Sequence, residues 1–283
     1  MKALLLYNPK SGHARIDKHL DDIIEIFRKA QIDIRAKRIE FSMYPLADES
    51  DVELVVICGG DGTINFVVNN MRKLNINPLI GIIPAGTAND FAGALGMSRN
   101  ILRAARQIAY GSERKVDCGL VNNTHFVNVL SFGVLTTTSQ QTSDREKRVM
   151  GKLAYVRVGL KDLHRKHRIP LHIKSDNEEF DVDAMMFLAF IGETAGRFPL
   201  ARMSKIDDGL LDVLILEYRS LLATCWNMFR YLCGGKPRSV RYIQTKALSI
   251  TTMLHENTDV DGQAGPDFPM VVTCQKDGLR VRC

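Results

Sequence analysis

The chain lacks the sequence features that mark disulfide-bonded, zinc-binding or membrane-spanning proteins. Its six cysteines lie far apart and form no C-x-x-C pair, which argues against a zinc site or a disulfide framework and favours reduced thiols in a cytoplasmic protein. Its apolar runs, such as 54–58 and 185–191, are far shorter than the roughly 18 residues of a membrane-spanning helix. The apolar run 3–7 is shorter than a signal-peptide core and is predicted to be a first strand.

Two widespread nucleotide-binding motifs are also missing. No Gly-Lys-Ser/Thr sequence occurs in the chain, which excludes a P-loop, and no G-x-G-x-x-G opens a helix, so a Rossmann dehydrogenase is poorly supported. The net charge of +6 is modest for 283 residues and the basic residues are spread widely, so we expect no nucleic-acid partner. With 45% hydrophobic residues, the chain is long enough for two domains with separate cores.

The first hundred residues alternate short apolar strands with amphipathic helices, a pattern typical of an open α/β sheet. Residues 54–58 are entirely apolar, as expected of a central strand that is buried on both faces. In such sheets a ligand lies outside the carboxyl ends of the strands. The predicted strands are 3–7, 32–39, 54–58 and 79–83, and the predicted helices are 16–30, 64–74, 89–95 and 101–109.

From about residue 115 the pattern changes to alternating strands, which predicts a mainly antiparallel β-sandwich or barrel. Two helices should interrupt it, near 146–166 and 220–233. The boundary is placed at Cys118, which gives an α/β domain over 1–118 and a β-rich domain over 119–283. The strands are expected at 115–121, 125–130, 171–174, 180–191, 210–217, 240–251 and 270–275.

The most informative loop follows the strand at 54–58 and has the sequence Gly59-Gly-Asp-Gly-Thr-Ile-Asn65. Its three glycines allow positive φ and close backbone approach, and the helix that follows presents free N–H groups, so the loop suits a bound phosphate. A carboxylate beside phosphates makes chemical sense mainly when a Mg²⁺ ion lies between them, so Asp61 indicates a metal-bound nucleotide.

Two further loops follow predicted strands at the same edge of the sheet. They have the sequences Asn8-Pro-Lys-Ser-Gly12 and Pro84-Ala-Gly-Thr-Ala-Asn-Asp90. Each alone is compatible with a helix-capping turn, because Ser11, Asn89 and Asp90 are favourable capping residues. Three such loops at one edge favour a shared phosphate site.

With these loops, the chain resembles the diacylglycerol-kinase catalytic domain in its bacterial lipid-kinase form, a family that includes sphingosine and ceramide kinases. The three loops, Ile206-Asp-Asp-Gly-Leu-Leu-Asp212 and Asp261-Gly262 occur in the family's order over nearly the whole chain. The resemblance implies a nucleotide-binding α/β domain like those of phosphofructokinases and NAD kinases, followed by a β-rich lipid-binding domain. It also implies ATP and Mg²⁺ as cofactors and a lipid hydroxyl as phosphoryl acceptor.

The resemblance assigns roles by position, with Asp61 acting catalytically through Mg²⁺. A second, structural Mg²⁺ is implied at the Asp208 side chain and the carbonyls of Leu210 and Lys205. From the residues alone a surface β-turn is the preferred interpretation of Asp207-Asp208, so both interpretations stay open. The implied nucleotide-binding residues are Asn8, Gly12, Gly59, Gly60, Asp61, Gly62, Thr63, Asn65, Gly86, Thr87 and Asn89.

The sequence departs from the family at the expected catalytic base. The family's C-terminal motif is Asp-Gly-Glu, whereas this chain has Asp261-Gly262-Gln263, and a neutral amide cannot accept a proton at physiological pH. A general base contributes about 10²- to 10⁴-fold, while phosphoryl transfer depends mostly on positioning and metal electrostatics, so slow turnover is compatible with Gln263. Asp261 and Asp259 are alternative bases. Segments 132–136 and 192–200 also differ from the family pattern, which leaves the lipid acceptor open.

Residues 144–168 form a predicted basic amphipathic helix, with nine basic and three acidic residues around apolar positions at helical spacing. An ordinary solvated helix is the simpler interpretation, and a surface drawn to anionic lipid is the alternative. We expect a cytoplasmic protein that associates peripherally with membranes, with a homodimer as a candidate assembly. His13 and Trp226 are expected to be a loop residue and a helix-packing residue.

Three functions remain in competition. The leading hypothesis is an ATP-dependent lipid kinase that acts on a diacylglycerol-like hydroxyl. The second is a catalytically weak relative that binds nucleotide or lipid as a sensor, which Gln263 motivates. The third is NAD-kinase-like phosphorylation, which the Gly-Gly-Asp-Gly sequence favours and the other two loops disfavour.

Overall fold

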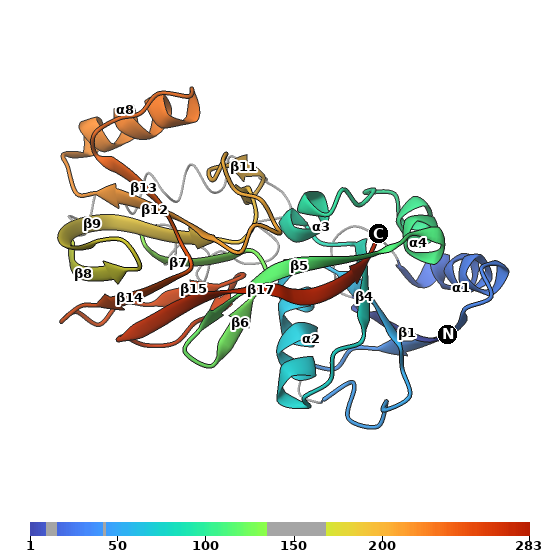
Figure 1. The fold of residues 1–283 in the computed structure, drawn as a ribbon. Helices are drawn as coiled ribbons and strands as arrows, with labels where there is room; N and C mark the ends of the chain where they lie inside the picture. Colours follow the sequence, from blue (N-terminus) through green and yellow to red (C-terminus); the bar gives the residue numbers. More distant parts are fainter. Residues whose placement is uncertain (10–15, 42–43, 135–167) are drawn as a thin grey trace. The chain divides into compact units, whose positions relative to one another are not determined.

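A computed structural model describes residues 1–9, 16–41, 44–134 and 168–283 (Figure 1). Within them the chain divides into two compact units. The first consists of Met1–Asp117 together with Asp277–Cys283, and the second of Cys118–Lys276. The predicted division at residue 118 agrees with this except at the C-terminus, where the last seven residues return to the first unit.

The first unit is built on a parallel sheet with the strand order β4-β3-β1-β2. Every residue of β3 (Leu54–Gly59) is buried, as expected for a strand with helices on both faces. Val281, near the end of β17 (Met270–Arg282), pairs in parallel with Ile80 on the far side of β4, which explains why the C-terminus belongs to this unit. The other strands are β1 (Lys2–Tyr7), β2 (Asp33–Arg38) and β4 (Leu79–Pro84).

The helices of the first unit follow the predicted positions closely. A short 3-10 turn, η1 (Ile16–His19), leads into α1 (Leu20–Lys29), which buries Ile23 and Phe27, one helical turn apart. The side chain of Asn100 caps α4 by accepting a hydrogen bond from the Arg103 N–H at 2.9 Å. The remaining helices are α2 (Asp61–Lys73), α3 (Asp90–Ala94) and α4 (Ile101–Tyr110).

The second unit is mainly antiparallel, as predicted. Strand β9 pairs with β7 and β8, and also with β12, which in turn pairs with β13. Strand β14 pairs with β8 and β17. The strands are β5 (Glu113–Val121, which begins in the first unit), β6 (Thr124–Phe126), β7 (Val129–Gly133), β8 (Ile169–Ser175), β9 (Glu179–Phe190), β10 (Thr194–Ala195), β11 (Phe198–Pro199), β12 (Leu211–Glu217), β13 (Val240–Thr245), β14 (Ala247–Thr251), β15 (Thr258–Val260) and β16 (Gln263–Ala264).

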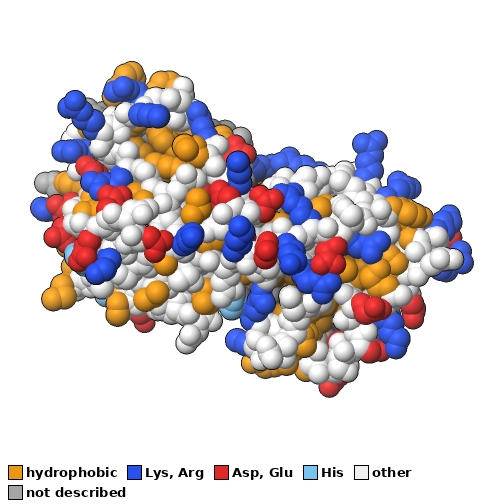
Figure 2. Space-filling model, in the orientation of Figure 1, with side chains coloured by type: hydrophobic (Ala, Val, Ile, Leu, Met, Phe, Trp, Pro, Cys, Tyr) orange, Lys and Arg blue, Asp and Glu red, His pale blue; other side chains and the backbone are white. Residues whose placement is uncertain are grey.

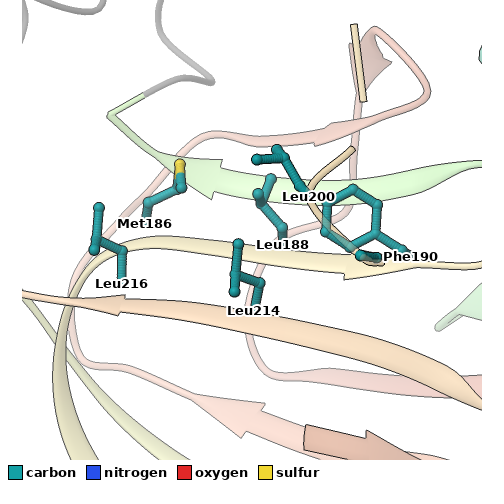
Figure 3. Close-up of a cluster of buried hydrophobic side chains, with 7 residues drawn as sticks. Met186, Leu188, Phe190, Leu200, Leu214 and Leu216 are labelled. Atoms are coloured by element: carbon teal, nitrogen blue, oxygen red, sulfur yellow. The ribbon is translucent and has the colours of Figure 1, made fainter. Parts of the chain in front are cut away.

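A hydrophobic cluster fills one face of this unit (Figure 3). Alternate residues of β9 and β12 point to the same side, because successive strand residues face opposite ways. Helix α8 (Leu221–Leu232) covers the cluster through Met228, Tyr231 and Leu232. The cluster consists of Met186, Leu188, Phe190, Leu200, Ala201, Leu214 and Leu216.

Two predicted strands are interrupted in the structure. The predicted strand 125–130 divides into β6 and β7, because the Asp261 carboxylate accepts the N–H groups of residues 127–129. The predicted strand 240–251 divides into β13 and β14 at Lys246, whose N–H is bound by the Asp176 carboxylate at 2.8 Å. In both places a carboxylate takes backbone donors that a continuous strand would use in its ladder. The predicted helix near 146–166 lies outside the described residues.

None of the helices in the described part of the chain is long and apolar enough to cross a membrane.

Candidate functional site

The predicted phosphate loops lie at the carboxyl ends of adjacent strands in the first unit. The Asn8 N–H donates to the Cys58 carbonyl at 3.2 Å, which joins the end of β1 to that of β3. The Ala85 N–H donates to the Gly59 carbonyl at 2.9 Å and joins β3 to β4. The two glycine loops therefore begin side by side, as the open-sheet pattern predicts. Gly12 lies outside the described residues.

Gly60 and Gly86 bring the two loops into direct backbone contact. A Cβ atom added to Gly86 would lie 2.4 Å from the Gly60 Cα, and one added to Gly60 would lie 2.9 Å from the Gly86 Cα. Gly60 has a φ of −99°, so a residue other than glycine would be excluded here by space and not by backbone conformation. The close approach in the structure is between the two loops, and the predicted approach of this backbone to a phosphate stays a prediction.

The Asp61 carboxylate ties the β3 loop to the first turn of α3. It accepts hydrogen bonds from the N–H groups of Asp90 at 3.2 Å and Phe91 at 3.0 Å. Burial and the neighbouring Asp90 carboxylate raise the pKa of Asp61, while the two backbone N–H groups act in the opposite direction. Asp61 is thus a half-buried carboxyl beside a second carboxyl, a setting in which a bound cation would favour the charged form.

Asn89 fixes the shape of the β4 loop. Its Oδ1 atom accepts the Gly86 N–H at 2.8 Å, and its Nδ2 atom donates to the Gly86 carbonyl at 2.9 Å. The residue has a φ of 56°, in the left-handed region that asparagine tolerates better than most residues. The side chain predicted to contact nucleotide is therefore occupied in holding its own loop, and its contact with nucleotide stays a prediction.

The other predicted nucleotide residues differ in exposure. Thr63 is buried, and a Cβ on Gly59 would lie 2.5 Å from its side chain. Asn65 is also buried, and its Oδ1 atom accepts a hydrogen bond from Asn69 Nδ2 at 3.1 Å. Thr87 is exposed at the tip of the β4 loop. Gly60, Asp61 and Gly86 thus lie close together, whereas Thr63 and Asn65 are buried at the start of α2.

In the second unit, Asp261 and Gly262 form the tight turn of the β15–β16 hairpin. Their φ angles are 51° and 87°, and Val260 pairs with Gln263 directly across the turn. Two consecutive residues with positive φ are characteristic of a type I′ turn, for which Asp-Gly is a favoured sequence. Gln263 is exposed at the start of β16.

The Asp261 carboxylate is buried and accepts three backbone N–H groups. They come from Val127 at 2.7 Å, Asn128 at 3.0 Å and Val129 at 2.8 Å. Asp259 is also buried, and its Oδ1 atom accepts the Gly262 N–H at 2.8 Å. Both candidate bases therefore hold the hairpin and its neighbouring strand in place. Whether either also accepts a proton stays a prediction.

The segment with the predicted structural metal ion is a tight turn before β12. The Oδ1 atom of Asp208 accepts the Leu210 N–H at 3.0 Å, and Gly209 has a φ of 78°. This hydrogen bond fits the β-turn interpretation. Among the described residues no group of three His, Cys, Asp or Glu side chains could hold a metal ion. Asp208 with the carbonyls of Lys205 and Leu210 would supply the oxygen donors that Mg²⁺ prefers, so the metal site remains a prediction that the donor chemistry fits.

Asp212, quoted above only as the last residue of a family motif, is a buried polar group in the structure. Its side chain is fully buried, and its Oδ1 atom accepts hydrogen bonds from the Tyr242 hydroxyl at 2.5 Å and from Gln244 at 2.8 Å. Burial and this carboxylate raise the pKa of Tyr242. An acidic residue between apolar neighbours within the predicted strand 210–217 was the available signal, because an unpaired buried charge is costly.

Comparison with known proteins gives two family matches that together span most of the chain. Residues 2–121 match the model for the diacylglycerol kinase catalytic domain. Residues 128–283 match the model for the YegS C-terminal NAD kinase beta sandwich-like domain. The order of these matches agrees with the α/β unit and the β-rich unit described above.

A diacylglycerol kinase of Bacillus subtilis (strain 168) is 32% identical over 277 residues, which is 95% of this chain and 91% of that protein. The chain belongs to the diacylglycerol kinase catalytic-domain family. A diacylglycerol kinase of Staphylococcus aureus (strain bovine RF122 / ET3-1) is 31% identical over 95% of the chain and 88% of its own length. The resemblance drawn from the sequence motifs is thereby confirmed.

Solved structures agree with this assignment. Two solved structures titled as a putative diacylglycerol kinase from Bacillus anthracis str. Sterne superpose with TM-scores of 0.83 and 0.80, both at 26% identity and over 99% of this chain. The matches cover 97% and 96% of those two chains. The predicted fold class, an α/β domain followed by a β-rich sandwich-like domain, is confirmed for this member of the diacylglycerol kinase family.

Proposed function

We propose that the protein is an ATP- and Mg²⁺-dependent lipid kinase that phosphorylates the hydroxyl group of a diacylglycerol-like lipid. The contact between Gly60 and Gly86 carries this proposal, because it holds the loops after β3 and β4 side by side at the strand ends, where open α/β sheets bind their ligands. The names of the relatives support the same substrate class. NAD-kinase-like activity is the less favoured alternative, since relatives that match 95% of the chain are named diacylglycerol kinases.

Bound MgATP would supply the phosphoryl group, and the chain's own residues would bind and orient it. The backbone N–H groups of the loops that Gly60 and Gly86 hold together would bind the phosphates. Asp61 would act through the metal ion, consistent with a carboxylate that two backbone N–H groups hold in place. In the transfer, the bond from phosphorus to the β,γ-bridging oxygen of ATP breaks, a bond to the lipid oxygen forms, and the hydroxyl proton leaves to a base.

The identity of that base separates the enzyme from the second candidate function, a nucleotide or lipid sensor. Gln263 cannot take the proton, and Asp261 has its carboxylate oxygens committed to three N–H groups. We therefore expect a turnover number well below that of a relative with glutamate at this position. A sensor that binds ATP without transferring the phosphoryl group fits the same residues.

The lipid substrate implies a membrane surface as partner. We propose a cytoplasmic protein that associates peripherally with anionic bilayers and assembles as a homodimer. The basic residues of the helix predicted at 144–168 support the membrane association, and all of them except Arg168 lie outside the described residues.

One assay separates the candidate functions. The full chain is incubated with γ-labelled ATP, Mg²⁺ and vesicles of phosphatidylglycerol that contain diacylglycerol, with NAD in a parallel reaction. Label transferred to lipid supports the kinase, and label transferred to NAD contradicts it. ATP binding in calorimetry without transfer to either acceptor leaves the sensor as the function.

A further inference from the structure

Helix α8 presents two large aromatic side chains to solvent. Trp226 is 60% exposed and Phe229 is 57% exposed, and their rings stack with centroids 5.9 Å apart. Trp226 was expected from the sequence to be a helix-packing residue, and its exposure corrects that expectation. Exposed aromatic residues that adjoin one another mark a surface for binding more often than singly scattered ones do.

The inward face of the same helix is already packed. Met228, Tyr231 and Leu232 lie against the cluster of β9 and β12, and the Tyr231 hydroxyl donates to the Leu200 carbonyl at 2.6 Å. Trp226 and Phe229 lie one helical turn apart on the opposite side. The helix is therefore anchored to its sheet through one face, and the aromatic pair is not needed for that packing.

Basic side chains gather at the C-terminal end of α8. The helix ends in a Schellman motif, in which the Gly235 N–H donates to the Arg230 carbonyl at 2.8 Å and the Gly234 N–H donates to the Tyr231 carbonyl at 2.9 Å. The motif ends the helix at these two glycines, and Lys236 and Arg238 come directly after them in the sequence. Arg230, Lys236 and Arg238 are all exposed.

The charged residues of the segment that contains α8 have one sign, although Arg219 and Arg241 pair with Glu217 and Glu178 outside it. No acidic residue occurs from 218 to 255, whereas the same stretch carries Arg219, Arg230, Lys236, Arg238, Arg241 and Lys246. The guanidinium of Arg202 adds a further basic group by donating to the Leu232 carbonyl at the end of the helix. In Figure 2 the surface over α8 shows hydrophobic side chains beside Lys and Arg side chains.

We propose that this surface, the α8 face, is the part of the protein that enters the headgroup region of an anionic membrane. The α8 face comprises Trp226, Phe229, Arg230, Lys236 and Arg238. Aromatic rings favour the interface between water and hydrocarbon, and basic residues beside them are attracted to anionic lipid. A protein partner with an acidic groove would satisfy the charges, but a bilayer accommodates a protruding aromatic pair without a preformed pocket. The inference adds a location to the proposed lipid kinase and can be tested without turnover.

The protein contains a built-in probe, because Trp226 is its only tryptophan. We expect its emission to shift to shorter wavelength when phosphatidylglycerol vesicles are added, and to be quenched when the lipids carry brominated acyl chains. Phosphatidylcholine vesicles should leave the emission unchanged. Because exposed charges are screened over about 8 Å at physiological ionic strength, the shift should weaken steeply as salt is raised.

Matched variants separate the aromatic and the basic contributions. The pair Phe229→Ala and Tyr110→Ala compares two exposed aromatic residues on different helices, and only the first should weaken vesicle binding, by tenfold or more. Converting Arg230, Lys236 and Arg238 to Gln should lower the partition coefficient about a hundredfold, since each basic residue near anionic lipid contributes about fivefold. The same change at Arg99, Arg103 and Arg106, which are exposed on or beside α4, is the control.

Two outcomes would overturn the inference. Vesicle binding with no change in Trp226 emission would mean that another surface meets the membrane. Emission that is already blue-shifted without lipid, and that shifts to longer wavelength as dilution dissociates a dimer, would assign the α8 face to a second copy of the chain. The kinase proposal fails separately, through absence of phosphoryl transfer in a protein that still binds vesicles through Trp226.

Discussion

Two carboxylates predicted to take part in catalysis, Asp61 and Asp261, also hold backbone N–H groups. Asp61 accepts two and Asp261 accepts three, and each joins segments that are distant in the sequence. A carboxylate so engaged is fixed in position, which suits a group that must orient a metal ion or a substrate. Substitutions at these residues must therefore be judged by both stability and activity.

Asp61→Ala should abolish phosphoryl transfer and should also destabilise the first unit. The N–H groups of Asp90 and Phe91 would lose their acceptor, and unpaired buried donors cost about 1 to 3 kcal/mol each. Sequence reasoning alone expects a loop substitution that leaves the fold intact; the structure adds the cost in stability. Thermal unfolding and labelled-ATP turnover, measured on the same preparation, test both effects. Full turnover in a folded Asp61→Ala protein would contradict the proposed nucleotide site.

Gly86→Ala should raise the Michaelis constant for ATP by about tenfold or more. The new methyl group would lie 2.4 Å from the Gly60 Cα, so the two loops must separate and their backbones can no longer approach the same phosphates. Gly93→Ala is the matched control, because nothing lies within 4 Å of a Cβ at that position of α3. Steady-state kinetics with ATP as the varied substrate decides the outcome, and equal constants for both variants would remove Gly86 from the site.

At the scale of elements, the sequence predicted most strands and helices of the first unit within a few residues. Strand β3 is buried throughout and α1 buries residues at helical spacing, so local periodicity is sufficient there. The strands of the second unit were less predictable where a side chain interrupts them. The breaks at residues 127–129 and at Lys246 depend on Asp261 and Asp176, whose positions are set by tertiary structure and leave no periodic signal.

The candidate site, like the strands, could be predicted from the sequence only in part. The loop motifs predicted which strand ends carry Gly60, Asp61 and Gly86, because motif and topology act together. Two features of the site were not predictable, because both depend on side-chain contacts in the folded chain. One is the hydrogen bond that the Asn89 side chain accepts from the Gly86 N–H, and the other is the hydrogen bonding of the Asp261 carboxylate. Gln263 was recognised from the sequence alone, because its chemistry differs from the family pattern at a defined position.

Asp261→Asn tests the hairpin. An amide keeps one acceptor oxygen but turns a donor toward the N–H groups of residues 127–129, so we expect a loss of about 2 to 4 kcal/mol in the free energy of unfolding. Asp277→Asn is the control, because this exposed residue also has positive φ, at 55°. Denaturant unfolding measures the difference. An Asp261→Asn protein with unchanged stability and no turnover would instead identify Asp261 as the catalytic base.

At the scale of the whole molecule, enzyme and sensor differ in whether the bound ATP transfers its phosphoryl group to the lipid. The first unit carries the predicted phosphate loops and the second carries the hairpin with Gln263. Both domains of the family are present, since residues 2–121 and 128–283 match the two family models. We propose that the difference between enzyme and sensor depends on the exposed side chain of Gln263.

Gln263→Glu should raise the turnover number by about tenfold or more, the low side of what a general base contributes, and should leave ATP affinity unchanged. The residue is exposed at the start of β16, so the added charge is solvated and costs little stability. Gln31→Glu is the control, because Gln31 is also exposed and lies far from this hairpin in the sequence. Gln244→Glu is unsuitable, because Gln244 donates to the buried Asp212 carboxylate. Turnover with diacylglycerol and ATP binding by calorimetry are measured for each variant. Unchanged slow turnover in Gln263→Glu would mean that another group already removes the proton, and complete inactivity in both the wild type and this variant would leave the sensor as the function.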